Sequence, residues 1–136
     1  MATITREIRL HLHPDEVWDA VRDYGAVHRR LAPGFVVDTR LEDGARVVTF
    51  GNGAVVRELI VAVDDGARRL VWAVVGTALT HHNASMQVHD AGGDGSRVVW
   101  IADLLPDEAA PRIAGLIEQG LTTMQATLEQ TAPAAR

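Results

Sequence analysis

The spacing of turn signals between residues 35 and 105 constrains the fold more than any other feature. Six strand-like stretches follow one another there, separated by short clusters such as Glu42-Asp43-Gly44 and Gly51-Asn52-Gly53. Clusters of this kind are typical of tight turns between neighbouring strands. Strands joined by such short turns pair antiparallel. The pattern predicts strands over residues 35–41, 45–53, 54–63, 68–76, 79–90 and 96–105.

The segment before these strands predicts one further strand and two short helices. Residues 3–13 alternate between apolar and polar side chains, as a half-buried strand does. Pro14 is favoured in the first turn of a helix, and the acidic residues that follow it suit the positive end of the helix dipole. Gly25 is expected to end that helix, and a second short helix is expected before Pro33-Gly34.

A long helix is expected at the C-terminal end, over residues 107–130. Its apolar residues, including Ile113, Ile117 and Met124, recur at helical spacing. This helix is the only predicted element long enough to cover one face of the sheet. The expected fold class is therefore α+β: a curved antiparallel sheet of about seven strands that grips one helix and encloses a cavity. We expect one domain over residues 1–131 and a disordered tail over residues 132–136.

Composition narrows the classes of function. The chain has a net charge of −5, no lysine and no cysteine among its 136 residues. It has no dense basic run of the kind that binds nucleic acid, no possible disulfide or Cys-ligated zinc, and no apolar run long enough to insert into a membrane. It also lacks a phosphate-binding loop or nucleotide fingerprint. We expect a cytoplasmic monomer or homodimer without cofactor or metal.

Several local strings resemble the START-like superfamily, also called SRPBCC, which includes polyketide cyclase/dehydrase-like and lipid-transfer-like proteins. They are VWDAVRDYGAVHRRLAPG, VTFGNGAVVRELIVAVDD, RRLVWAVVG, HHNASMQVHD and WIADLLPDE, and together they span nearly the whole chain. The resemblance implies the helix-grip fold, with a hydrophobic cavity beneath the C-terminal helix. It does not imply one function, because a fold hosts many.

The resemblance also implies which side chains face the cavity. In the plant abscisic-acid receptors of this superfamily, the strand that RELIVAVDD resembles carries a glutamate that points inward, which corresponds to Glu58. The same comparison points Ile101 and Asp103 inward from the last strand, and Asn83 and Ser85 inward from the preceding one. The receptors' lysine that pairs with a ligand carboxylate has no counterpart here.

The stretch HHNASMQVH, residues 81–89, has two faces that the sequence alone does not assign. Alternation places His81, Asn83 and Ser85 on one face and His82 and Met86 on the other. Their polarity favours solvent for the first set, whereas the resemblance turns that set inward. Both cannot hold in a regular strand, since a shift of one residue exchanges the faces.

Glu58 and Asp103 are the candidate acid–base residues, because each lies mid-strand among apolar residues. Burial in a nonpolar cavity raises a carboxyl pKa and makes general acid–base chemistry possible. Either residue has an ordinary alternative. Glu58 is equally explained by an ion pair with Arg46, Arg57 or Arg69, and Asp103 by solvation on the outside.

We predict a protein that binds a small, mostly hydrophobic molecule, such as a polyketide, aromatic, lipid or terpenoid-like compound. The predicted ligand-binding residues are Val48, Phe50, Val56, Ile60, Ala73, Val75, Asn83, Ser85, Ile101, Ile117, Gly120 and Met124. The alternative is a cofactor-free cyclase, dehydratase or isomerase, with catalytic residues Glu58, Asp103, His81 and His82. A further alternative is a module that binds a protein partner, which predicts a collapsed cavity and an exposed apolar patch.

Overall fold

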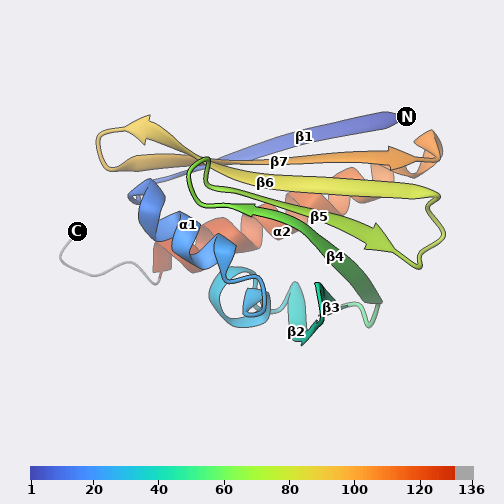
Figure 1. The fold of residues 1–136 in the computed structure, drawn as a ribbon. Coiled ribbons are helices and arrows are strands. Elements are labelled where there is room, and N and C mark those ends of the chain that lie inside the picture. The colour runs from blue at the N-terminus through green and yellow to red at the C-terminus, as the bar shows by residue number, and fades with distance from the viewer. Residues whose placement is uncertain (131–136) are drawn as a thin grey trace.

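Seven strands form one antiparallel sheet in the computed structural model, which describes residues 1–130 (Figure 1). The order across the sheet is β1-β7-β6-β5-β4-β3-β2, so β2 to β7 form a meander and β1 is added beside β7. The strands are β1 Ala2–Leu10, β2 Val36–Glu42, β3 Ala45–Phe50, β4 Val55–Asp64, β5 Arg69–Val75, β6 His81–Gly92 and β7 Gly95–Leu105. The predicted fold class and number of strands are confirmed.

Two short helices connect the opposite edges of the sheet. β1 and β2 are the two edge strands, and the chain between them forms α1 (Pro14–Arg22) and the π-helix η1 (Val27–Leu31). α1 begins where the sequence predicts, with the Nδ1 atom of His13 accepting a hydrogen bond from the backbone N–H of Asp15 at 3.1 Å. The two helices were expected, although the π-helical form of the second was not.

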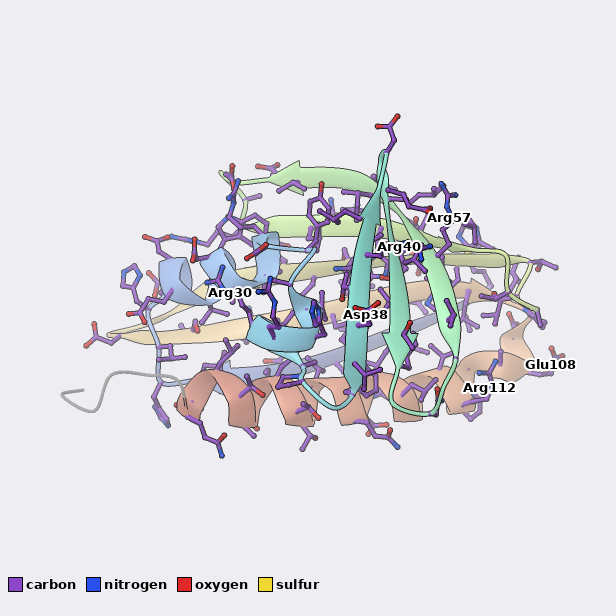
Figure 2. The ribbon with its side chains drawn as sticks, turned by 90° about the horizontal axis from the view of Figure 1, so that it is seen from below. Arg30, Asp38, Arg40, Arg57, Glu108 and Arg112 are labelled. Atoms are coloured by element: carbon purple, nitrogen blue, oxygen red, sulfur yellow. The ribbon has the colours of Figure 1, made fainter. Side chains whose placement is uncertain are left out.

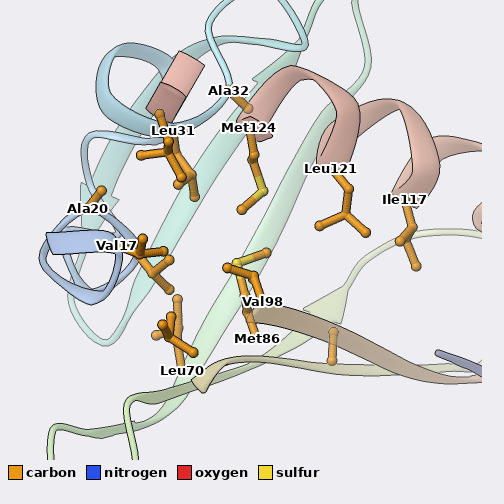
Figure 3. Close-up of a cluster of buried hydrophobic side chains, with 14 of the residues drawn as sticks. Val17, Ala20, Leu31, Ala32, Leu70, Met86, Val98, Ile117, Leu121 and Met124 are labelled. Atoms are coloured by element: carbon orange, nitrogen blue, oxygen red, sulfur yellow. The ribbon is translucent and has the colours of Figure 1, made fainter. Parts of the chain in front are cut away.

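The C-terminal helix lies across the concave face of the sheet (Figure 1). A short 3₁₀ turn, Asp107–Ala109, precedes α2, which spans Ala110–Gln130. Its buried face carries Ile113, Ile117, Gly120, Leu121, Met124 and Leu128. Figure 3 shows part of this face packing toward Met86 and Val98 of the sheet and Val17 and Leu31 of the short helices. The tail predicted over residues 132–136 lies outside the described residues.

The faces of β6 and β7 follow the hydrophobic pattern. His82, Ala84, Met86 and Val88 point toward α2, and their direct partners on β7 are Leu104, Ala102, Trp100 and Val98. We call the opposite side of the sheet the outer face. It carries Asn83 and Ser85 of β6 opposite Asp103 and Ile101 of β7. No bulge interrupts this pairing between residues 81 and 90. The facing implied by the resemblance for these four residues is therefore not the one observed.

None of the helices within residues 1–130 is long and apolar enough to cross a membrane.

Candidate functional site

A cavity of about 120 Å³ lies between the concave face of the sheet, α2 and η1. Its walls are mostly aliphatic and aromatic side chains, contributed by η1, β3, β5, β6, β7 and α2. An apolar cavity of about 150 Å³ in another protein holds benzene. The volume here therefore suits a molecule of about one ring.

The cavity wall contains a buried ion pair. Arg46 of β3 and Glu58 of β4 are direct cross-strand partners, and Nε of Arg46 lies 2.8 Å from Oε1 of Glu58. Their side chains are only 7% and 9% exposed. Because each charge is compensated by the other, the pair adds a polar group to the cavity without adding a net charge.

Two further contacts fix the guanidinium of Arg46. It donates a hydrogen bond to the backbone carbonyl of Tyr24 at 3.2 Å. It also lies over the ring of Trp72, with Cζ 5.2 Å from the ring centroid, which is a cation–π geometry. In the described chain, only Oε1 of Glu58 accepts a hydrogen bond, so its second carboxylate oxygen remains able to accept one from a ligand.

His82 is the other ionisable residue that lines the cavity. Burial of its half-buried ring lowers the pKa of His82, and the nearby positive charges of His81 and Arg112 lower it further. The ring is consequently neutral at pH 7 and can accept a proton at one nitrogen. Glu58 and His82 lie two strands apart, which corresponds to roughly 10 Å between their backbones.

Trp100 contributes an unpaired hydrogen-bond donor. It lines the cavity, and its Nε1 atom is buried without a hydrogen-bond partner in the described chain. Its ring contacts that of Trp72 edge to face, with the centroids 5.8 Å apart. A buried donor without an acceptor costs about 1–3 kcal/mol. A ligand with an acceptor oxygen within reach of Nε1 would recover part of that cost.

The structure brings seven of the predicted site residues to the cavity. They are Val48, Phe50, Glu58, His82, Ile117, Gly120 and Met124. Val56 and Ile60 lie on the same face of β4 as Glu58 and are half-buried, but they do not line the cavity.

The remaining predicted residues do not reach the cavity. Ala73, Val75, Asn83, Ser85, Ile101 and Asp103 lie on the outer face, and His81 is exposed. Asp103 accepts a hydrogen bond of 2.6 Å from Oγ1 of Thr3 on the neighbouring strand. We expected these residues to face the cavity. The register of β4 to β7 shows instead that they lie on the face away from α2, where Val75 is the partner of Arg57.

Sequence reasoning missed part of the site. Arg46 was considered only as one of three possible partners of Glu58, and Leu31 and Phe35 were not considered at all. The alternation of Arg46, Val48 and Phe50 places Arg46 on the same face as two predicted lining residues. This alternation is the sequence signal that could have identified Arg46 as a cavity residue. The sequence predicts a strand that begins at Phe35, whereas β2 begins at Val36, so strand alternation does not orient Phe35.

Comparison with known proteins gives one family. Residues 1–129 match the model of a family described as polyketide cyclase / dehydrase and lipid transport. A search of curated proteins returned no match.

Solved structures with the same fold come from several sources. The di-domain ARO/CYC BexL from the BE-7585A biosynthetic pathway is 17% identical, with a TM-score of 0.83 over 98% of this chain and 48% of that one. Norcoclaurine synthase from Thalictrum flavum, in complex with dopamine and hydroxybenzaldehyde, is 18% identical, with a TM-score of 0.73 over 97% and 88%. A START superfamily protein from Mycobacterium smegmatis is 13% identical, with a TM-score of 0.69 over 94% of both chains. At these identities, the likeness shows a shared START-like fold.

Proposed function

Because the chain belongs to the polyketide cyclase / dehydrase and lipid transport family, within the START-like superfamily, we propose that it binds a small, mostly hydrophobic molecule in the cavity under α2. The observation that carries this proposal is the cavity itself, whose apolar walls enclose the neutralised Arg46–Glu58 pair. Ligand sites commonly combine apolar walls with a few fixed polar groups.

The polar groups favour an uncharged ligand with at least one oxygen. Arg46 is already neutralised by Glu58, and His82 is neutral at pH 7, so a charged ligand would meet no free opposite charge in the cavity wall. Trp100 offers a donor through Nε1, and Glu58 offers an acceptor through its second oxygen. A carbonyl on an apolar ring can accept from Trp100, and a hydroxyl can in addition donate to Glu58. The solved complex of norcoclaurine synthase, which has this fold, holds dopamine and hydroxybenzaldehyde.

Native mass spectrometry of freshly purified protein, beside a denatured control, tests whether the protein carries a ligand. The site is then tested with a matched pair of variants. Val48→Phe adds a ring inside the cavity, whereas Val61→Phe makes the same change on an exposed position of β4, where Val61 is 58% exposed. We expect Val48→Phe to lose the bound mass and Val61→Phe to retain it.

If the wild type carries no ligand, we would titrate it and the two variants with phenol and with acetophenone and follow tryptophan fluorescence. The affinities of Val48→Phe and Val61→Phe are then compared in the same way. Binding that survives equally in Val48→Phe and Val61→Phe would place the ligand elsewhere on the protein. Absence of binding by the wild type to either compound, together with no mass lost on denaturation, would count against the proposal.

His82 favours a second candidate function, a cofactor-free cyclase, dehydratase or isomerase. Its neutral ring faces the cavity and could take a proton from a carbon next to a ligand carbonyl. Trp100 Nε1 could stabilise the oxyanion that then develops. His82→Asn should abolish turnover of a substrate while leaving its binding intact. A variant that keeps its turnover would exclude this role.

A further inference from the structure

Phe35 borders two separate hollows. Its ring lines the internal cavity, and it also lines a groove on the outer side of α2 with Glu118, Gln119, Thr122 and Thr123. No other residue of the described chain lines both. The ring therefore forms part of the wall that separates an apolar interior from a polar, open surface.

Gly120 is the residue of α2 that makes room for this wall. A Cβ at this position would lie 3.0 Å from Cε2 of Phe35 and 3.1 Å from Cζ3 of Trp100. These distances are shorter than ordinary van der Waals contact, so both rings reach the helix only because the side chain is absent. The ring of Phe35 also contacts Phe50 edge to face, with centroids 5.4 Å apart.

The chain around Phe35 is held through its backbone. The carbonyl of Phe35 accepts a hydrogen bond from the N–H of Gly51 at 2.9 Å, and the N–H of Val36 donates to the carbonyl of Ala32 at 2.9 Å. The ring itself is only half-buried. These bonds do not involve the side chain, so replacing the ring leaves them in place.

We propose that Phe35 is a specificity-determining residue of the cavity, acting as the wall that separates the cavity from the groove on α2. This inference rests on the proposed binding function. With the ring as observed, the site ends at about one ring. With the ring removed, the cavity and the groove become one site, which admits an apolar ring that carries a linear chain with a polar end. The polar end would then lie among the threonine and glutamine side chains of the groove.

A series of phenylalkanols, with alkyl chains of one to about eight carbons, tests the inference. These probes keep one ring and one hydroxyl and change only the length. We expect the wild type to bind the short members and to gain little from a longer chain. Phe35→Ala should favour the longest over the shortest member by roughly tenfold more than the wild type does, because each buried methylene adds to affinity.

Met124→Ala is the matched control. Met124 lines the same cavity, is 1% exposed and does not reach the groove, so its removal enlarges the cavity without opening that wall. An equal change in length preference in Met124→Ala and Phe35→Ala would overturn the inference, because added volume alone would then explain it. Should Phe35→Ala fail to fold, Phe35→Leu provides a smaller opening with an apolar side chain retained.

Acrylamide quenching of tryptophan fluorescence gives a second readout that needs no ligand. Trp100 and Trp72 line the cavity, so opening the wall should expose them to the quencher. We expect stronger quenching in Phe35→Ala than in Met124→Ala, and equal quenching would overturn the inference. If no phenylalkanol binds any variant while quenching still differs, the proposed binding function fails for this class and the wall remains supported.

Discussion

Arg46 and Glu58 face each other directly across β3 and β4 and form the most deeply buried ion pair in the described chain, 2.8 Å long. Their nearest equivalent on the surface is Arg57–Glu42, whose Nε–Oε1 distance is 3.1 Å and whose side chains are 46% and 39% exposed. Arg46–Glu58 joins β3 to β4, and Arg57–Glu42 joins β4 to β2. Only the second pair is open to water. Figure 2 shows Arg57 of β4 near Arg40 of β2, and both side chains pair with Glu42.

Glu58→Gln is expected to destabilise the fold by about 3–5 kcal/mol, because it leaves the Arg46 charge buried without an opposite charge. Glu42→Gln should cost much less, since water screens the exposed pair. Urea denaturation of both variants at pH 7 measures the difference. Similar losses of unfolding free energy in the two variants would show that burial does not set the contribution of the Arg46–Glu58 pair to stability.

Replacing both partners should recover part of the loss. The double variant Arg46→Met/Glu58→Leu removes both buried charges together and fills the space with apolar side chains, which is often neutral or stabilising for buried ion pairs. We expect it to be more stable than Glu58→Gln alone in the same urea titration. A double variant that is less stable would indicate that the bond from Arg46 to Tyr24 carries much of the stability.

His82 should make stability fall on acidification. The pKa of His82 is lowered in the folded protein, mainly by burial, so near and below pH 6.5 the unfolded chain binds a proton more readily than the folded one. Stability contributed in this way is complete above that pH and is lost as the pH falls through it. The free energy of unfolding should therefore depend less on pH, between pH 7 and pH 5, in His82→Asn than in the wild type. An unchanged slope would contradict the burial of this ring.

Two glycines of α2 should respond differently to alanine. A Cβ at Gly115 meets no atom within 4 Å, whereas a Cβ at Gly120 meets the rings of Phe35 and Trp100. Gly115→Ala should stabilise the protein by up to about 1 kcal/mol through helix propensity. Gly120→Ala should be less stable than Gly115→Ala by about 1–3 kcal/mol, because the rings must move. Thermal unfolding of the two variants in parallel measures this difference. Equal stabilisation of both would show that helix propensity alone decides the effect.

The outer-face residues provide a test of where the ligand binds. Asp103 bonds to Thr3, and Ser85 lies opposite Ile101 on the face away from α2. Asp103→Asn and Ser85→Ala should therefore change the affinity for phenol or acetophenone by less than about twofold, whereas Val48→Phe should abolish binding. Loss of binding in Asp103→Asn would point to a site on the outer face.

The sequence by itself determined the elements of this fold. Turn clusters such as Gly51-Asn52-Gly53 separate the strands, Pro14 begins α1, and the apolar stripe of residues 110–130 forms one face of α2. These signals are local, because each depends on residues within one turn or one helical repeat. The inward direction of Met86 could be predicted for the same reason, since only one face of that strand is apolar.

Only the tertiary structure decided which residues meet in the cavity. Both faces of β7 are largely apolar, so alternation could not choose between Trp100 and Ile101, and the pairing of Trp100 with Met86 settled it. Three arginines could have paired with Glu58. The register placed Arg46 opposite it, whereas Arg57, as its sequence neighbour, had to point to the other face. Phe35 meets Gly120 across 85 residues, and such long-range contacts arise only when the helix is laid on the sheet.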